Sequence, residues 1–135
     1  GVVATVAEGL SEPMGLCWHD GALYVAESGA DRVVRIVKGR VELVAGSGQP
    51  GLADGPAAQA AFSIPQGITV GGDGTVYVSD TGNSAVRRVR GGVVDTLAAR
   101  DMASIHYEKN TCTHTYSGSD KHPAHFLSEA GRDFF

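Results

Sequence analysis

The sequence contains little cysteine, few aromatic residues and no long apolar run. Two cysteines in 135 residues, Cys17 and Cys112, do not form the disulfide framework of a small secreted domain. No apolar run approaches the roughly 20 residues that a membrane-spanning helix needs. The net charge of −4 argues against a dedicated nucleic-acid surface, which needs a concentrated positive field. These features exclude several classes of protein but leave the cellular compartment open.

Motifs for catalysis are also missing. The sequence has no nucleophile elbow, no phosphate-binding glycine loop and no paired-histidine zinc motif. His19 lies at a predicted turn without a catalytic partner nearby in the sequence, so a turn residue is the better interpretation. We interpret the following group as part of a flexible or capping tail and not as a zinc site: Cys112, His114, His122 and His125. The sequence therefore predicts no catalytic residue, no metal and no cofactor, while enzymatic activity stays an open question.

The abundant residue is glycine, with 19 copies placed between short apolar runs, and these runs form a repeat. A Pro-x-Gly-(Leu/Ile) motif, a Tyr-Val pair and a Val-rich strand with arginine occur over residues 13–36 and again over 65–89. The offset is 52 residues at the two prolines and 53 after an extra residue within 71–74. A repeat of this length built only of strands is typical of a β-propeller blade. We therefore expect an all-β fold with two four-stranded blades.

Asp-Gly and Gly-Gly pairs between the apolar runs predict tight turns, and these turns set the strand boundaries. The expected strands of the first copy are 14–19, 22–26, 32–37 and 41–45. Those of the second copy are 66–70, 75–79, 85–90 and 93–98. Between the copies we expect a loop over 46–56 and a single helical turn that places Phe62 against the neighbouring blade.

Two segments break the repeat. Residues 2–7 resemble the fourth strand of each copy but lack the three strands that normally precede it, so we expect them to complete a blade that begins elsewhere. Residues 100–135 do not match the repeat and have weak strand patterns at 104–108, 111–117 and 124–127. We expect a capping tail or a degenerate third blade ahead of the remaining alternative, a sequence unrelated to the repeat region that was joined to it by recombination, frameshift or fusion. We accordingly divide the chain into a two-blade segment, 1–99, and an unmatched tail, 100–135.

Two blades leave apolar faces bare, which predicts association with other copies. Three chains of two blades would close a six-bladed ring. Alternatively, the tail supplies three strands of a third blade and residues 2–7 supply its fourth, so that two chains close the ring. A third possibility is that the segment is excised from a longer parent.

Several segments of the chain resemble the NHL repeat family. They lie at 46–55, 62–68 and 76–88, and the likeness covers about residues 1–99. The first copy departs from the pattern at Glu27, Ala30 and Asp31. The resemblance implies a six-bladed propeller that most members use as a binding platform for proteins or RNA or as an extracellular sensor. A related minority are lyases, some with metal-held propellers.

Five residues are candidates for binding: Arg35, Arg87, Arg88, Asp80 and Asn83. Asp80 with Asn83 would make a ligand or metal site in a loop, but we favour a structural role in which Asp80 accepts backbone N–H groups and Asn83 takes a left-handed turn position. The arginines would make a patch for RNA or another polyanion, but we favour a solvated outer face.

The sequence therefore predicts a non-catalytic binding or scaffold module whose blades assemble into an oligomeric ring. The partners expected are further copies of the chain and a protein, without nucleic acid and without a membrane. The first alternative is the propeller part of a lyase or hydrolase with its site at the central channel, and the second is binding of RNA or another polyanion.

Overall fold

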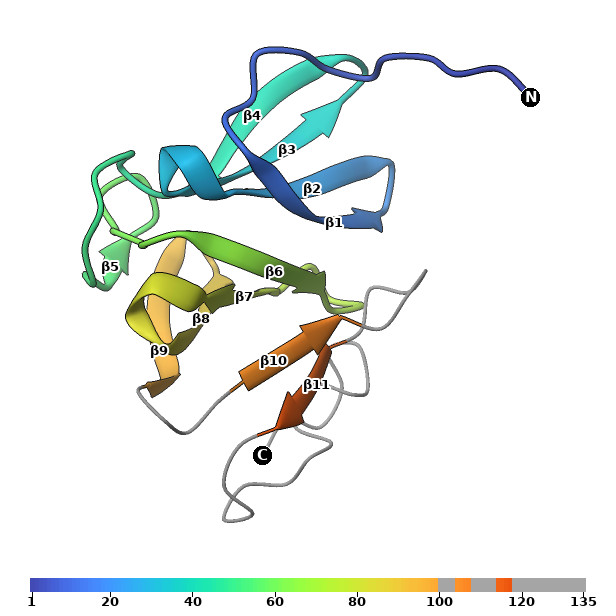
Figure 1. Ribbon diagram of the computed structural model, residues 1–135. Helices are drawn as coiled ribbons and strands as arrows, with labels where there is room; N and C mark the ends of the chain where they lie inside the picture. Colours follow the sequence, from blue (N-terminus) through green and yellow to red (C-terminus); the bar gives the residue numbers. More distant parts are fainter. Residues whose placement is uncertain (100–103, 108–113, 118–135) are drawn as a thin grey trace.

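A computed structural model describes residues 1–99, 104–107 and 114–117 of the chain. These residues form two antiparallel sheets that stand face to face, and a separate two-stranded pair (Figure 1). The strands of the first sheet follow one another in chain order: β1 (Pro13–His19), β2 (Ala22–Glu27), β3 (Arg32–Val37) and β4 (Arg40–Ala45). This all-β meander confirms the predicted first blade to within a residue or two at each strand end.

The second sheet repeats the meander and adds one short strand at its outer edge. Its strands, from the outer edge inward, are β5 (Gly55–Pro56), β9 (Val93–Ala99), β8 (Ala85–Arg90), β7 (Val76–Asp80) and β6 (Pro65–Val70). Short 3₁₀ turns join the second and third strands of each sheet, η1 (Ser28–Ala30) and η2 (Thr81–Asn83). The two predicted blades are therefore present as two equivalent sheets.

The turns follow from residues that tolerate positive φ. Asp20 and Gly21 between β1 and β2 have φ of 48° and 82°, which is the geometry of a two-residue hairpin turn. Each 3₁₀ turn ends on a left-handed residue, Asp31 in the first sheet and Ser84 in the second. The expectation that Asn83 takes this left-handed position is wrong, because Asn83 is the last residue of η2 and Ser84 follows it in the left-handed region.

The main core lies between the two sheets. The first sheet contributes small side chains such as Cys17 and Ala26, and the second contributes Ile68, Val70 and Val78, all at most 5% exposed. Small residues on one sheet let the branched residues of the other approach closely. Burying each branched side chain contributes about 1.5–3 kcal/mol, so this contact is a major source of stability for the pair.

The linker between the sheets also contributes to this core. The backbone N–H groups of Gln59 and Ala60 both donate to the carbonyl of Pro56, at 2.9 and 3.0 Å, which makes a single helical turn. The turn leads to Phe62, which is fully buried between the sheets. This confirms the predicted role of the linker.

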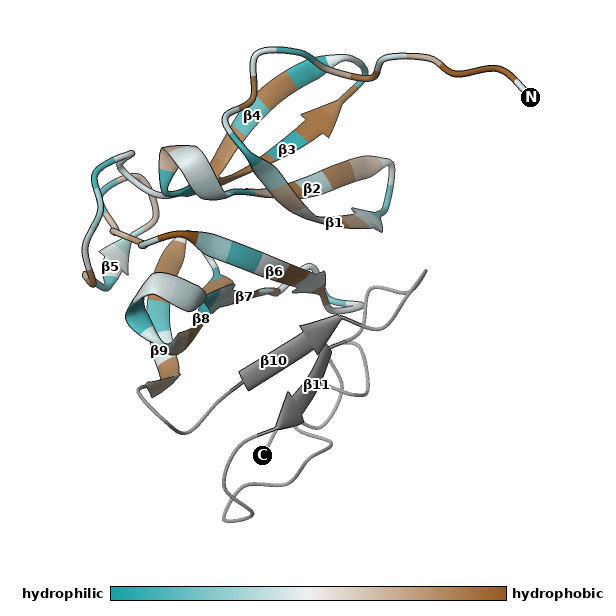
Figure 2. Ribbon diagram, viewed as in Figure 1, coloured by the Kyte–Doolittle hydropathy of each residue, from teal (hydrophilic) through white to brown (hydrophobic). Residues whose placement is uncertain are grey.

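The N-terminal segment, residues 1–12, crosses the other side of the first sheet without forming a strand in the described chain. Ala7 and Leu10 pack against a small cluster of Val25, Val34 and Ile36. The residues that precede Ala7 are exposed, with Val2 96% and Val3 97% exposed. This end of the chain is also apolar, as the brown N-terminal trace in Figure 2 shows. That residues 2–7 complete a blade elsewhere stays a prediction.

Two further strands lie in the C-terminal part. β10 (Ser104–Tyr107) and β11 (His114–Ser117) pair antiparallel and lie close to β6 (Figure 1). They fall within the weak strand patterns expected at 104–108 and 111–117. The third pattern, at 124–127, lies outside the described residues, as do Cys112, His122 and His125.

Candidate functional site

The most connected polar side chain is Arg87, on the face of β8 that looks toward the first sheet. It is fully buried, and its Nη1 donates to Asp80 Oδ2 and to the carbonyl of Ala61, both at 2.7 Å. Its Nη2 donates to the carbonyl of Ala53 at 2.8 Å and to Asp54 Oδ1 at 3.0 Å. The expectation that Arg87 lies on a solvated face is therefore wrong, because its guanidinium ties the linker to the second sheet.

Asp80 and Asn83 belong to the same network. Asp80 is fully buried and accepts from the backbone N–H of Ser63 at 2.7 Å, as the structural interpretation predicted. Asn83 Nδ2 donates to Asp80 Oδ2 at 2.7 Å and to the carbonyl of Gly51 at 2.8 Å. Burial raises the pKa of Asp80, while the hydrogen bonds from Asn83, Ser63 and Arg87 act against this shift. Three of the five candidates thus form a clamp on the linker.

The first sheet lacks this clamp. Glu27 takes the place of Asp80 and accepts from the backbone N–H of Ser11 at 2.8 Å and from Arg32 Nε at 2.7 Å. The positions of Asn83 and Arg87 hold Ala30 and Val34 in the first copy. The acidic anchor is therefore common to both sheets, whereas an arginine and an asparagine that bind carbonyls of the preceding linker are found, among the described residues, in the second sheet.

The remaining two candidates, Arg35 and Arg88, occupy equivalent places in the two sheets. Arg35 Nε donates to Glu42 Oε1 at 2.9 Å, and its Nη1 donates to the hydroxyl of Tyr24 at 3.4 Å. The hydrogen bond with Tyr24 makes the largest contribution to raising the pKa of Arg35, and the bond to Glu42 makes the second largest. Arg88 pairs in the same way with Asp95, through its Nε at 3.0 Å and its Nη2. Each arginine is thus held across adjacent strands by a carboxylate.

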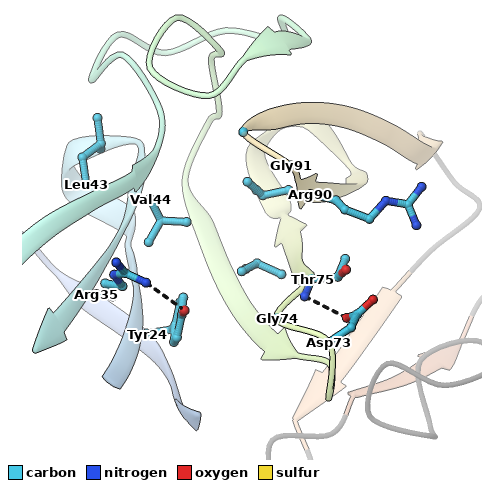
Figure 3. Close-up of a pocket in the computed structure, with 12 residues that line it drawn as sticks. Tyr24, Arg35, Leu43, Val44, Asp73, Gly74, Thr75, Arg90 and Gly91 are labelled. Atoms are coloured by element: carbon cyan, nitrogen blue, oxygen red, sulfur yellow. Dashed lines mark hydrogen bonds between the residues drawn. The ribbon is translucent and has the colours of Figure 1, made fainter. Parts of the chain in front are cut away.

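Tyr24 and Arg35 line a groove between the two sheets, at the end where the tight turns gather (Figure 3). The groove has a volume of about 430 Å³, and an adjoining hollow of about 420 Å³ shares Tyr24, Arg35 and Asp73 with it. The first sheet supplies one wall, with Val44 beside Tyr24 and Arg35. The glycine-rich turns of the second sheet and the strand ends beside them supply the other: Asp73, Gly74, Thr75, Val76, Val89, Arg90, Gly91 and Gly92.

Both signs of charge line this groove. Arg35 brings positive charge, whereas the side chain of Arg90 points away (Figure 3), and Asp73 brings a carboxylate that accepts the backbone N–H of Thr75 at 2.9 Å. This bond, together with one from the Thr75 hydroxyl, lowers the pKa of Asp73. Mixed charge beside main-chain groups suits a polar segment such as an extended peptide better than an apolar small molecule.

A second candidate surface is the side of the first sheet that faces away from the second sheet. This open face carries Leu16, Trp18 and Leu43, which are 54%, 65% and 48% exposed. The strand pairing places Leu16 opposite Val25 and Leu43 opposite Val34, so these side chains share one side of the sheet with the cluster under Ala7 and Leu10. The open face is therefore apolar from β1 to β4.

Sequence reasoning did not single out the groove residues Tyr24 and Asp73 as site residues. The signal that points to Tyr24 is its recurrence as Tyr77 at the same place in the second copy, each beside an arginine on the next strand. His19 lines the adjoining hollow, and its ring is inclined at 61° to that of Tyr24, with the two ring centroids 6.4 Å apart. The described residues hold no group of three His, Cys, Asp or Glu side chains placed to bind a metal. Within the same residues, no helix is long and apolar enough to cross a bilayer.

Comparison with known proteins assigns the repeat. Residues 62–89 match the NHL repeat, which confirms the predicted resemblance for the second copy. Over 59% of its length the chain is 35% identical to Protein SUPPRESSOR OF QUENCHING 1, chloroplastic, of Arabidopsis thaliana, and the match covers 8% of that protein. A structural-genomics protein of unknown function from Bacteroides thetaiotaomicron superposes with a TM-score of 0.52 at 29% identity, over 56% of this chain and 20% of the other. The chain thus spans a small part of both relatives.

Proposed function

We propose that this chain is a non-catalytic propeller segment that serves as a binding or scaffold module. In this proposal its two blades assemble with other copies into a closed ring, and the ring presents a surface for a protein or another ligand. The NHL repeat and the two propeller-like sheets support a binding or scaffold role. Dimers and trimers are the two assemblies that would bring the ring to six blades.

One observation carries the proposal: the same side of the sheet is buried in one copy and exposed in the other. Ile68 and Val70 of the second sheet are 0% and 5% exposed, because the first sheet covers them. Their equivalents in the first copy, Leu16 and Trp18, are 54% and 65% exposed. An apolar sheet face of this kind favours association, and the packing inside the chain shows the type of surface that fits it.

The groove is the surface that such a ring would present. A closed ring repeats a groove between each pair of neighbouring blades, so that several equivalent sites point to one side of the ring. Binding of RNA loses its support, because Arg87 is buried and Arg35 and Arg88 are paired with carboxylates. A protein or peptide partner remains the better ligand class.

Solution mass together with tryptophan fluorescence tests the assembly. Trp18 is the only tryptophan of the chain, so its emission reports directly on the open face. We expect the mass to rise to two or three copies with concentration, up to roughly 100 μM, and the Trp18 emission to move to shorter wavelength in parallel.

The variant Leu16→Asp keeps the reporter and should abolish both changes, because it places a charge in the proposed contact. Leu52→Asp is the matched control, since Leu52 lies in the linker and is also 54% exposed. A mass of one copy and an unchanged emission spectrum over the whole concentration range would refute assembly through this face.

A further inference from the structure

The two sheets present the same tight turn at one end of the molecule. Asp20-Gly21 joins β1 to β2, and Asp73-Gly74 lies at the equivalent place between β6 and β7. Because the two sheets stand face to face, the repeat brings both aspartates to the same hollow of about 420 Å³. Each sheet therefore places one carboxylate beside the space between the sheets.

The charges around this space do not cancel. Arg35 is paired with Glu42, its Nε donating to Oε1 at 2.9 Å, so these two groups balance each other. The side chain of Arg90 points away from the groove (Figure 3). Among the described residues, neither Asp20 nor Asp73 takes part in an ion pair. The space between the sheets thus keeps two carboxylates without a cationic partner in the described chain.

The groove beside the hollow has a different lining. Apolar side chains and glycine main chain surround it: Val44, Val76, Val89, Gly74, Gly91 and Gly92. A Cβ added at any of the three glycines would meet no atom within 4 Å, so their main-chain groups face open space. Groove and hollow form one continuous space, because they share four lining residues: Tyr24, Arg35, Asp73 and Gly74.

This division suits an extended peptide segment. Main-chain groups and apolar contacts hold an extended backbone with little regard to its sequence, and an adjoining pocket then selects one side chain. Lysine and arginine combine an aliphatic stem, which can lie along the ring of Tyr24, with a charged end that carboxylates bind well. An acidic side chain in the same place would meet two like charges, which is costly.

We propose that the groove between the two sheets binds an extended segment of a partner protein, and that the hollow takes a lysine or arginine side chain of this segment between Asp20 and Asp73. The inference rests on the proposed binding role and names the class of ligand that the groove selects. Both walls of the site belong to one chain, so the site exists without an assembled ring.

A nuclear magnetic resonance titration of the full chain with two heptapeptides tests the proposal. The probes are acetylated and amidated Ser-Thr-Val-Lys-Val-Thr-Ser and the same peptide with glutamate in place of lysine. We expect the lysine peptide to shift the amide signals of Gly74, Gly91 and Gly92, with a dissociation constant at least about tenfold lower than that of the glutamate peptide. Raising the salt concentration from about 50 to about 500 mM should reduce this difference.

The double variant Asp20→Asn with Asp73→Asn removes both charges, while asparagine remains suited to both turn positions. It should bind the lysine peptide at least about tenfold more weakly than the parent chain and no longer discriminate between the two peptides. Glu8→Gln is the matched control, because Glu8 is an exposed acidic residue of the N-terminal segment, on the other side of the first sheet. It should bind both peptides within about twofold of the parent chain.

A second variant tests the location by size instead of charge. Gly72 lines the hollow, and a Cβ at this position would meet no atom within 4 Å, so the side chain of Gly72→Leu has room to enter the hollow. We expect this variant to keep the circular dichroism spectrum of the parent chain and to bind the lysine peptide at least about fivefold more weakly. It decides the case if the double aspartate variant does not fold.

The following results would each overturn the proposal: no saturable shift up to about 10 mM lysine peptide, equal affinity for both peptides, or shifts confined to residues outside the groove. Folded groove variants that bind like the parent chain would overturn it as well. A chain that stays a single copy and binds the lysine peptide would refute the ring and support the groove. A chain that assembles but does not bind the peptide would refute the groove alone.

Discussion

Replacing Arg87 by methionine should be one of the most destabilising substitutions in the described chain. Methionine keeps most of the buried aliphatic volume but removes four hydrogen bonds, to Asp80, Asp54, Ala53 and Ala61. It leaves the carboxylate of Asp80 buried without its cation. Breaking a buried ion pair from one side costs about 3–5 kcal/mol. Against a total stability of about 5–15 kcal/mol, this is a large part of what keeps the fold.

Urea unfolding followed by far-ultraviolet circular dichroism measures the effect. With a slope of about 2 kcal/mol per molar urea, the midpoint should fall by roughly 2 M. Arg88→Met is the control: Arg88 is the next residue on β8, its side chain is 20% exposed, and its partner Asp95 is 45% exposed. A pair of this kind contributes about 0–1 kcal/mol.

The double variant Arg87→Met with Asp80→Asn separates charge from packing. It removes both buried charges, so it should be less destabilised than Arg87→Met alone, and the difference measures their coupling. If Arg87→Met costs no more than Arg88→Met, the clamp does not hold the linker and the reasoning fails.

Two further substitutions test the turns. Gly82→Ala should cost about 1–3 kcal/mol, because its Cβ would collide with the backbone of Ser63, whereas Gly72→Ala, with open space around it, should be within about 0.5 kcal/mol of the parent in urea unfolding. The pKa of Asp73 is lowered by Thr75, so its contribution to stability is present above the unfolded pKa and is lost as the pH falls through the folded value, below the ordinary 3.8. Nuclear magnetic resonance titration should show this depressed pKa, and Asp73→Asn should remove that part of the acid dependence; an Asp73 that titrates at its ordinary value would contradict it.

The strands and turns were predictable because their signals are local. Asp20-Gly21 and Gly91-Gly92 occupy the positive-φ positions that tight turns need, and the apolar runs between such pairs are the length of one strand. The burial of Phe62 was predictable from the repeat. An apolar residue at the end of the linker between two stacked sheets is expected to pack between those sheets.

The role of Arg87 was not predicted because its partners in the linker lie 26 to 34 residues away in the sequence, although Asp80 is only seven residues away. A signal was present, however. Neighbouring residues on a strand point to opposite sides of a sheet, so Arg87 and Arg88 do not both face solvent in a blade packed on two sides. The groove was harder to foresee, since it forms only where turns of the second sheet meet Tyr24 and Arg35 of the first.

The reach of Asn83 and Arg87 into the linker also bears on how such repeats are exchanged between proteins. Their hydrogen bonds attach the segment 51–61 to the sheet that follows it. A unit that can be exchanged between proteins therefore begins at Gly46 and ends with β9. Such a unit contains the sheet together with the linker that precedes it. A recombination crossover within the linker would separate Asn83 and Arg87 from the linker carbonyls that they bind.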